Sequence, residues 1–253
     1  MFNTESNPIL SKIDKVASNV NTSNTLTVDG VNTKFAAMLV MMMITAFWTW
    51  NKYSDAAIAA ATNGDMPGSF VAFIFGGLIV GFIAVLVSSF KPHLSGFLAP
   101  VYAFAEGFTI GGLSLVTEVM YPGVVMQAIL ATIGVALGTI VLYKFNLVKV
   151  TDKFMSIVFM ATAGIAVMYL VSIVFSLFGM PATFLHDGSP LSIGISLVVI
   201  FFAAMNLFVD YELINRARGV AAKEYEWLYA MGVMVTIVWL YIEFLRLFSN
   251  LRK

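Results

Sequence analysis

Three carboxylic acids, Glu106, Asp210 and Glu243, lie inside or at the inner edge of stretches that otherwise consist of apolar residues. If those stretches are membrane helices, an ionisable side chain near the bilayer centre costs about 2.5–3.5 kcal/mol on insertion scales. Acids in such places usually serve an ion or proton pathway, or pair with polar groups of neighbouring helices. These three residues are therefore the candidate functional groups.

Asp210 closes an apolar stretch, in the segment NLFVDYELINRARG. Its position near a helix end allows a purely structural role, in which the carboxylate pairs with Arg216 or Arg218 at the membrane surface. Glu212 faces a different side of the helix, and we expect it to be solvated.

Glu243 and Glu106 each have a structural alternative as well. Glu243 and Arg246 fall on one helix face, so an i,i+3 ion pair could neutralise both. Glu106, in YAFAEGFTIGG, has no basic residue near it in the sequence. Its partner must come from another helix or from water, either as a neutral hydrogen-bonded acid or as a step on an ion path.

Asp210 and Glu243 could instead face each other inside the bundle. Two carboxylates within a few ångströms in a low dielectric cannot both ionise cheaply, so they share a proton and titrate as a unit. Such a pair could hold a proton or a cation and would respond to pH. Calcium prefers oxygen ligands of this kind, which makes Asp210 and Glu243 candidate calcium ligands.

The composition is typical of a membrane protein. The chain has 253 residues, of which 60% are hydrophobic and 11% charged, whereas soluble domains average about 45–50% apolar and about 25% charged. Cysteine is absent, which excludes disulfides and thiolate chemistry, and two histidines supply little for a zinc site. Hydrolase motifs and a phosphate-binding glycine loop are missing. We therefore expect a non-enzymatic protein without a cofactor.

Seven apolar stretches approach or exceed the length of about 20 residues that a membrane helix needs. Short turns rich in Pro, Gly, Asn and Asp separate several of them, so consecutive helices should lie antiparallel in one all-α bundle. Residues 1–33 are rich in Asn, Ser and Thr and predict a flexible cytoplasmic tail, and residues 34–253 form the transmembrane domain. The expected spans are residues 35–50, 70–90, 97–119, 124–145, 154–178, 191–209 and 227–248.

Small residues recur four positions apart in three of these stretches. In lipid, where apolar burial gives little driving force between helices, such pairs let two backbones approach closely. They predict close helix packing at Gly77–Gly81, Gly107–Gly111 and Gly134–Gly138.

The distribution of Lys and Arg predicts the orientation, because cytoplasmic loops carry an excess of both. The opposite side holds Lys52 alone among the loops. Seven spans place the C-terminus outside although its last turns are basic, and we expect the last stretch to cross, since sixteen uncharged residues precede Glu243; the alternative is that it enters and returns. The basic residues that place the N-terminus in the cytoplasm are Lys12, Lys15, Lys34, Lys91, Lys144, Lys149, Lys153, Arg216, Arg218 and Lys223.

Longer motifs occur in the same order as in a known family. They are SNPILSK near the N-terminus, YAFAEGFTIGGLS, YPGVVMQAILATIGV, VTDKF, NLFVDYELI and the ending EWLYAMGVMVTIVWLYIEFLRLFSNLRK. On these motifs, over essentially the whole chain, the sequence resembles the transmembrane Bax inhibitor motif family, specifically its bacterial branch. The resemblance implies a bundle of seven helices in the bacterial cytoplasmic membrane, with the last helix surrounded by the other six.

The resemblance also implies a function. Family members are described as calcium-permeable leak channels that are gated by pH through two aspartates, at the end of the sixth helix and in the seventh. Asp210 matches the first by its place in VDYELI, where relatives often have Asp-Thr-Gln. Glu243 matches the second by its place in LYIEFLRLF, where Asp is commoner. A basic residue near the end of the second helix can engage the aspartate in relatives, and Lys91 is the candidate here; no family role carries over to Glu106.

Two functions follow from these observations. The leading hypothesis is a passive, proton-sensitive cation leak, with calcium as the permeant ion and Asp210 and Glu243 as the gate. Another branch of the family is associated with a membrane-bound quality-control protease. The alternative is therefore a non-transporting regulator that binds membrane proteins, with residues 1–34 as its natural contact. An intramembrane enzyme has the least support, because no nucleophile and base occur together.

Overall fold

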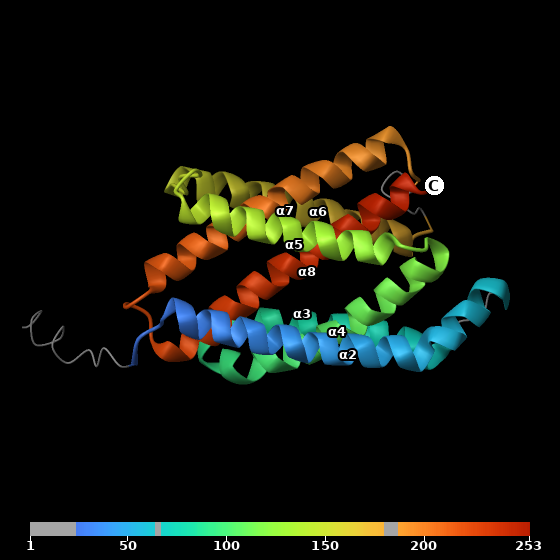
Figure 1. Ribbon diagram of the computed structural model, residues 1–253, viewed down its shortest axis with the longest axis horizontal. Helices are drawn as coiled ribbons and strands as arrows, with labels where there is room; N and C mark the ends of the chain where they lie inside the picture. Colours follow the sequence, from blue (N-terminus) through green and yellow to red (C-terminus); the bar gives the residue numbers. More distant parts are fainter. Residues whose placement is uncertain (1–23, 64–66, 180–186) are drawn as a thin grey trace, which may run out of the picture.

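The protein is a bundle of long helices, seen in a computed structural model that describes residues 24–63, 67–179 and 187–253 (Figure 1). Seven helices in these residues are long and apolar enough to cross a membrane. The predicted all-α membrane bundle is confirmed. Its helices are α2 (Val28–Asn63), α3 (Gly68–Phe90), α4 (Ser95–Met120), α5 (Val124–Lys144), α6 (Asp152–Leu177), α7 (Pro190–Ala217) and α8 (Glu226–Leu251), with short 3₁₀ turns η3 (Pro92–Leu94) and η5 (Lys223–Tyr225).

The largest departure from the predicted spans is at α2, which has 36 residues where sixteen were expected. The apolar stretch is extended on its N-terminal side by polar residues that still pack, and on its C-terminal side by the alanine-rich sequence AAIAAA, which favours helix. The expected boundary at residue 34 therefore lies inside a helix. Leu26 and Val31, on the tail side of that boundary, are buried. The rest of the predicted tail, residues 1–23, lies outside the described residues.

The last helix crosses the bundle in one piece. α8 has 26 residues, which corresponds to about 39 Å and exceeds the hydrocarbon thickness of about 30 Å. A continuous helix of this length fits the expected crossing and not a segment that enters and returns.

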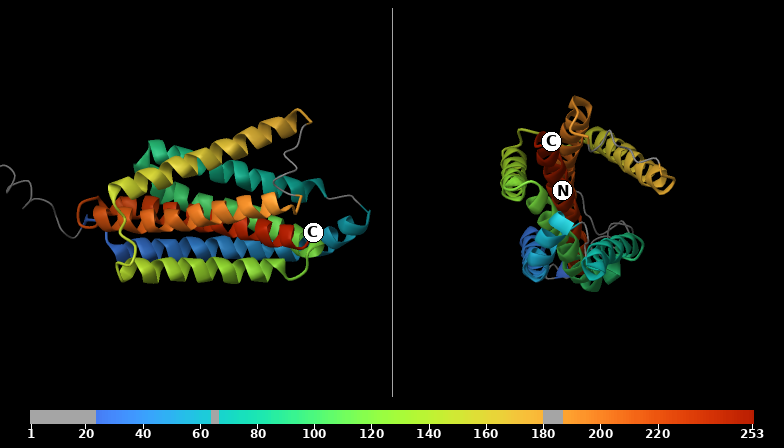
Figure 2. Two further views of the ribbon diagram at one scale, coloured as in Figure 1. Left: turned by 90° about the horizontal axis from the view of Figure 1, so that it is seen from above. Right: turned by 90° about the vertical axis from the view of Figure 1, so that its right-hand side faces the viewer.

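α8 lies at the centre of the bundle (Figure 2). It packs against α2, α4, α5 and α7, and the hydroxyl of Tyr169 on α6 reaches it by a hydrogen bond. α3 packs chiefly on α4. Six helices were expected to surround α8. Five of them contact it, and α3 is separated from it by α4. α6 diverges from the bundle and presents apolar side chains outward, as a lipid-facing helix does.

Two of the three predicted glycine pairs pack closely. A side chain at Gly77 would meet the backbone of Ala105 on α4, and one at Gly107 would meet Thr45 on α2. Gly134 and Gly138 on α5 have open space instead, so the prediction of close packing is wrong for that pair.

One end of the bundle carries the starts of α2, α4, α6 and α8 and the ends of α3, α5 and α7; we call it the N-terminal end. Here residues 24–27 lie along the α7–α8 connection, with Leu26 N donating to Ala221 O (2.8 Å) and Gly219 N to Leu26 O (3.1 Å). Glu226, fully buried, accepts hydrogen bonds from Thr27 and forms an ion pair with Lys34. The segment before the expected boundary is thus joined to the central helix.

Candidate functional site

Asp210 on α7 faces Thr236 on α8. The Thr236 hydroxyl donates to Asp210 Oδ2 at 2.7 Å and also lies 3.2 Å from the carbonyl oxygen of Gly232, one turn earlier. This is the one hydrogen bond of Asp210 within the described residues. Asp210 is half-buried as a residue, and its carboxylate oxygen Oδ2 lies in the α7–α8 interface against the Thr236 hydroxyl.

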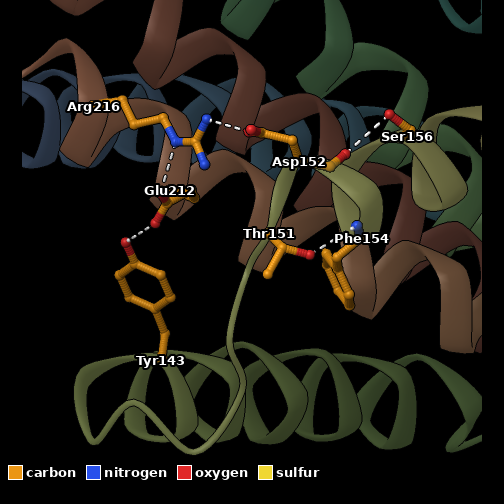
Figure 3. A network of polar contacts seen from close by, with 7 residues as sticks. All are labelled: Tyr143, Thr151, Asp152, Phe154, Ser156, Glu212 and Arg216. Atoms are coloured by element: carbon orange, nitrogen blue, oxygen red, sulfur yellow. Dashed lines mark hydrogen bonds and ion pairs between the residues drawn. The ribbon is translucent and has the colours of Figure 1, made fainter.

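The basic residues expected beside Asp210 are not its partners. Arg216 binds Glu212 through Nε (2.7 Å) and Asp152, at the start of α6, through Nη1 (2.6 Å) (Figure 3). The Tyr143 hydroxyl on α5 donates to Glu212 at 2.9 Å. The structural alternative for Asp210, a salt bridge with Arg216, is therefore not formed. The expectation of a solvated Glu212 is wrong, because the i,i+4 spacing aligns Glu212 with Arg216.

The two other basic residues considered as partners also form no ion pair with Asp210 in the described part of the chain. Lys91 follows the last residue of α3 and is exposed. Arg218 follows the last residue of α7 and is exposed as well. Neither forms an ion pair with any residue that the structure describes. Asp210 therefore has no counter-charge among the described residues.

Glu243 on α8 has the opposite environment. It is 2% exposed and forms an ion pair with Arg246 at 2.5 Å, so the i,i+3 pair predicted from the sequence is confirmed. Its other oxygen accepts hydrogen bonds from the Tyr169 hydroxyl (2.6 Å) and from Trp239 Nε1 (3.3 Å). The Arg246 guanidinium lies over the Tyr169 ring, 5.1 Å from its centre, and Arg246 Nε donates to Ser196 on α7. This buried pair joins α6, α7 and α8.

Asp210 and Glu243 do not meet. The α7–α8 register is antiparallel, with Asp210 beside Thr236 and Ser196 beside Arg246, so Glu243 lies opposite residues 199–203. Along α8, Thr236 and Glu243 are seven residues apart, which corresponds to about 10.5 Å. Calcium ligands lie about 2.3–2.6 Å from the ion. The expected shared proton and joint calcium site are therefore not formed in this arrangement, because each carboxylate has found a nearer partner.

Glu106 on α4 is 6% exposed and has no hydrogen-bond partner in the part of the chain that the structure describes. Its carboxylate lies against Gly81 on α3, where Oε2 would be 2.9 Å from an added Cβ. The missing side chain of Gly81 thus makes room for the acid. Glu106 is eleven residues from the start of α4, about 16.5 Å along the helix, and so lies near the middle of this 26-residue helix.

A cavity among the helices is lined by none of these acids. It has a volume of about 740 Å³ and is bordered by α2, α4, α5, α7 and α8. Its walls are almost entirely apolar, apart from groups such as Ser114 and Tyr241, which are hydrogen-bonded to each other at 2.7 Å. An apolar chamber of this kind suits hydrocarbon and not a hydrated cation.

Several site residues were missed from the sequence. Thr236 and Trp239 precede Glu243 by seven and four positions, so all three share a helix face and could have been found by that spacing. Tyr169 on α6 gives no such signal, because nothing in the sequence indicates which residue of α6 meets α8. The Lys34–Glu226 pair is separated by 192 positions and is likewise invisible to local patterns.

The fold and these intramembrane polar groups define a multi-pass helical membrane protein. The model of the Bax inhibitor 1 like family matches residues 7–253, and the chain belongs to that family. Comparison with curated proteins and with solved structures finds no match.

Proposed function

We propose that this protein is a passive, proton-sensitive cation leak in the bacterial cytoplasmic membrane, with its N-terminus in the cytoplasm and calcium as the permeant ion. The observation that carries the proposal is Asp210, an acid within a membrane helix that is held by one hydroxyl and has no counter-charge among the described residues. An intramembrane acid of this kind is by default a functional group. The proposal includes neither catalysis nor a resident cofactor.

The gate follows from how Thr236 can distribute one proton. When Asp210 is protonated, it can donate to the Thr236 oxygen while the Thr236 hydroxyl donates to Gly232 O at 3.2 Å. When Asp210 is ionised, it needs the hydroxyl proton for itself, and it carries an uncompensated charge in the α7–α8 interface. The protonated acid therefore holds α7 and α8 together, and ionisation favours their separation or the arrival of a cation.

Glu243 takes a second role in this proposal. Because Arg246 already neutralises it, a cation could bind Glu243 only by displacing the guanidinium. We therefore assign the pH response to Asp210, and assign to Glu243 the joining of α6, α7 and α8 near the other end of the pathway. Glu106 supplies a further acid along the bundle, between α3 and α4.

Calcium flux into proteoliposomes tests the proposal between about pH 6 and about pH 8, the range over which a buried carboxyl can change its charge. Wild-type flux should rise with pH. Asp210→Asn imitates the protonated acid and should give low flux at every pH, whereas Glu224→Gln, which removes an exposed acid from η5, should behave as wild type. A wild-type pH profile in Asp210→Asn would remove Asp210 as the gate, and wild-type liposomes without flux would remove the leak itself.

The alternative is a non-transporting regulator that binds membrane proteins such as a quality-control protease. Removing residues 1–23 tests it, and the deletion must end before Leu26, which is fully buried. Loss of protease capture with unchanged flux would favour the regulator; loss of neither would leave the tail without a role in either function.

A further inference from the structure

Two serine hydroxyls between α3 and α4 are buried without a partner. Ser88 and Ser95 are both 0% exposed, and neither hydroxyl forms a hydrogen bond within the described residues. Buried polar side chains in proteins nearly always have a partner, either protein or ordered water. These two hydroxyls therefore point to a ligand that can donate and accept hydrogen bonds.

The neighbouring serine shows that the helix itself offers a partner. Ser89, exposed on the other face of α3, donates to Val85 O four residues earlier at 2.9 Å. Ser114 and Ser196, both buried, also donate to carbonyl oxygens of their own helices. Ser88, which is turned toward α4, does not use this route. The Ser88 hydroxyl is therefore available to hydrogen-bond a ligand in the α3–α4 interface.

The register of the two helices places Ser88 on α3 level with Ser95 on α4. α3 and α4 run antiparallel and in close contact (Figure 1). Thr109 on α4 donates to Ile74 O on α3 at 3.1 Å, and an added Cβ at Gly81 would lie 3.5 Å from the Tyr102 ring. Seven residues further along α3, and seven back along α4, the same register places Ser88 opposite Ser95.

The same face of α4 leads from Ser95 to Glu106. Ser95, Ala99, Tyr102 and Glu106 are spaced by four, three and four residues, so they form one line along the helix. Tyr102 is 4% exposed, and helical side chains lean toward the N-terminus of their helix, so its phenol points back toward the serines. The side chains of this face between Ser95 and the Tyr102 ring, Ala84 on α3 and Ala99 on α4, are small, and the Tyr102 ring itself lies beside Gly81. The line ends at Glu106, the buried acid that has no hydrogen-bond partner within the described residues.

We propose that the α3–α4 interface holds a file of water molecules that connects the N-terminal end of the bundle with the Glu106 carboxyl through Ser88, Ser95 and Tyr102. Buried water typically makes about three hydrogen bonds to otherwise unsatisfied polar groups, and three hydroxyls and a carboxyl supply them. The file allows Glu106 to exchange its proton with solvent at that end, where Lys91 and His93 are exposed. This proposal does not depend on whether the protein conducts cations.

Modification of single introduced cysteines tests for water in the interface. The chain contains no cysteine of its own, so each variant has one reactive thiol. In proteoliposomes, a small hydrophilic methanethiosulfonate should modify Ser88→Cys and Ser95→Cys at least about tenfold faster than Ala103→Cys. Ala103 is the matched control, since it is also 0% exposed and lies on α4, about 80° around the helix from Ser95. Rates at Ser88→Cys and Ser95→Cys equal to that at Ala103→Cys would show a dry interface and overturn the proposal.

Infrared spectroscopy tests the connection to Glu106. The carboxyl band that is lost in Glu106→Gln should shift when wild-type proteoliposomes are transferred to D₂O. Ser88→Ala with Ser95→Ala should slow that shift about tenfold, whereas Ser89→Ala should not. A Glu106 band that is absent or does not shift would overturn the proton exchange, and an unslowed shift in the double variant would overturn the route.

Discussion

Asp210 and Thr236 meet at 2.7 Å between α7 and α8, two helical turns from the place where Glu243 meets Arg246. The two acids that the resemblance pairs are thus in different electrostatic environments. One has a neutral hydroxyl as its partner and the other a guanidinium. Burying a charge without a counter-charge is far more costly than burying an ion pair, so the proposed function places the change of protonation at Asp210 and not at Glu243.

The Asp210–Thr236 hydrogen bond should set the pH dependence of flux. Thr236→Val keeps the shape of the side chain but leaves Asp210 without its one hydrogen-bond partner among the described residues. We therefore expect calcium flux through this variant to stay high at low pH, where wild-type flux is low. Thr236→Ser restores the hydroxyl and should restore the wild-type profile. The net loss of stability in Thr236→Val should be about 1 kcal/mol, measured by thermal unfolding in detergent. A wild-type pH profile in Thr236→Val would contradict the role given to the hydroxyl.

The Glu243–Arg246 pair should contribute to stability through mutual neutralisation. Arg246→Met leaves a buried carboxylate unpaired and should cost about 3–5 kcal/mol. Adding Glu243→Gln removes that charge, so the double variant should be more stable than Arg246→Met alone. A double-mutant cycle of unfolding free energies measures the coupling. Additive losses would show that the two side chains are not a coupled pair.

Hydropathy was sufficient to predict the seven helices, because a helix in lipid must satisfy its backbone internally and needs an apolar surface. Hydropathy was not sufficient at α2, where the largely polar segment from Val28 to Lys34 is part of the helix. Tertiary contacts hold this segment in place: Lys34 binds Glu226, and Leu26 just before it is buried. Such contacts depend on which ends of the chain meet, and no local pattern contains that information.

The candidate site was predicted in composition but not in arrangement. Short-range geometry correctly gave the Glu243–Arg246 pair, since an i,i+3 spacing fixes the distance between the side chains. The Asp210–Glu243 pair depended on the axial register of α7 against α8, which side-chain packing along both helices decides. A shift of two turns separates the acids completely. The same kind of register, between α3 and α4, places Ser88 level with Ser95, and no sequence motif marks either serine.

Residues 24–34, around the expected start of the membrane domain, should be essential for folding. Lys34→Met removes the cation from a fully buried Glu226 and should cost about 3 kcal/mol or more. Deleting residues 1–23 should leave the thermal unfolding temperature unchanged, whereas deleting residues 1–34 should abolish folded protein. Size-exclusion chromatography and thermal unfolding in detergent check both. Stable protein from the longer deletion would show that the contacts of Thr27 and Lys34 are dispensable.

Glycines of similar spacing should respond in opposite ways to alanine. Gly→Ala in a helix favours the folded state by about 0.8–1.0 kcal/mol where space allows. At Gly138, which has open space, we expect a gain of that order. At Gly107 the new methyl would overlap Thr45 and the Met42 carbonyl on α2, and the helices would have to separate, so a net loss of about 1–3 kcal/mol is expected. Unfolding of both variants in detergent measures the difference, and equal effects at the two positions would mean that α2 and α4 are not in close contact.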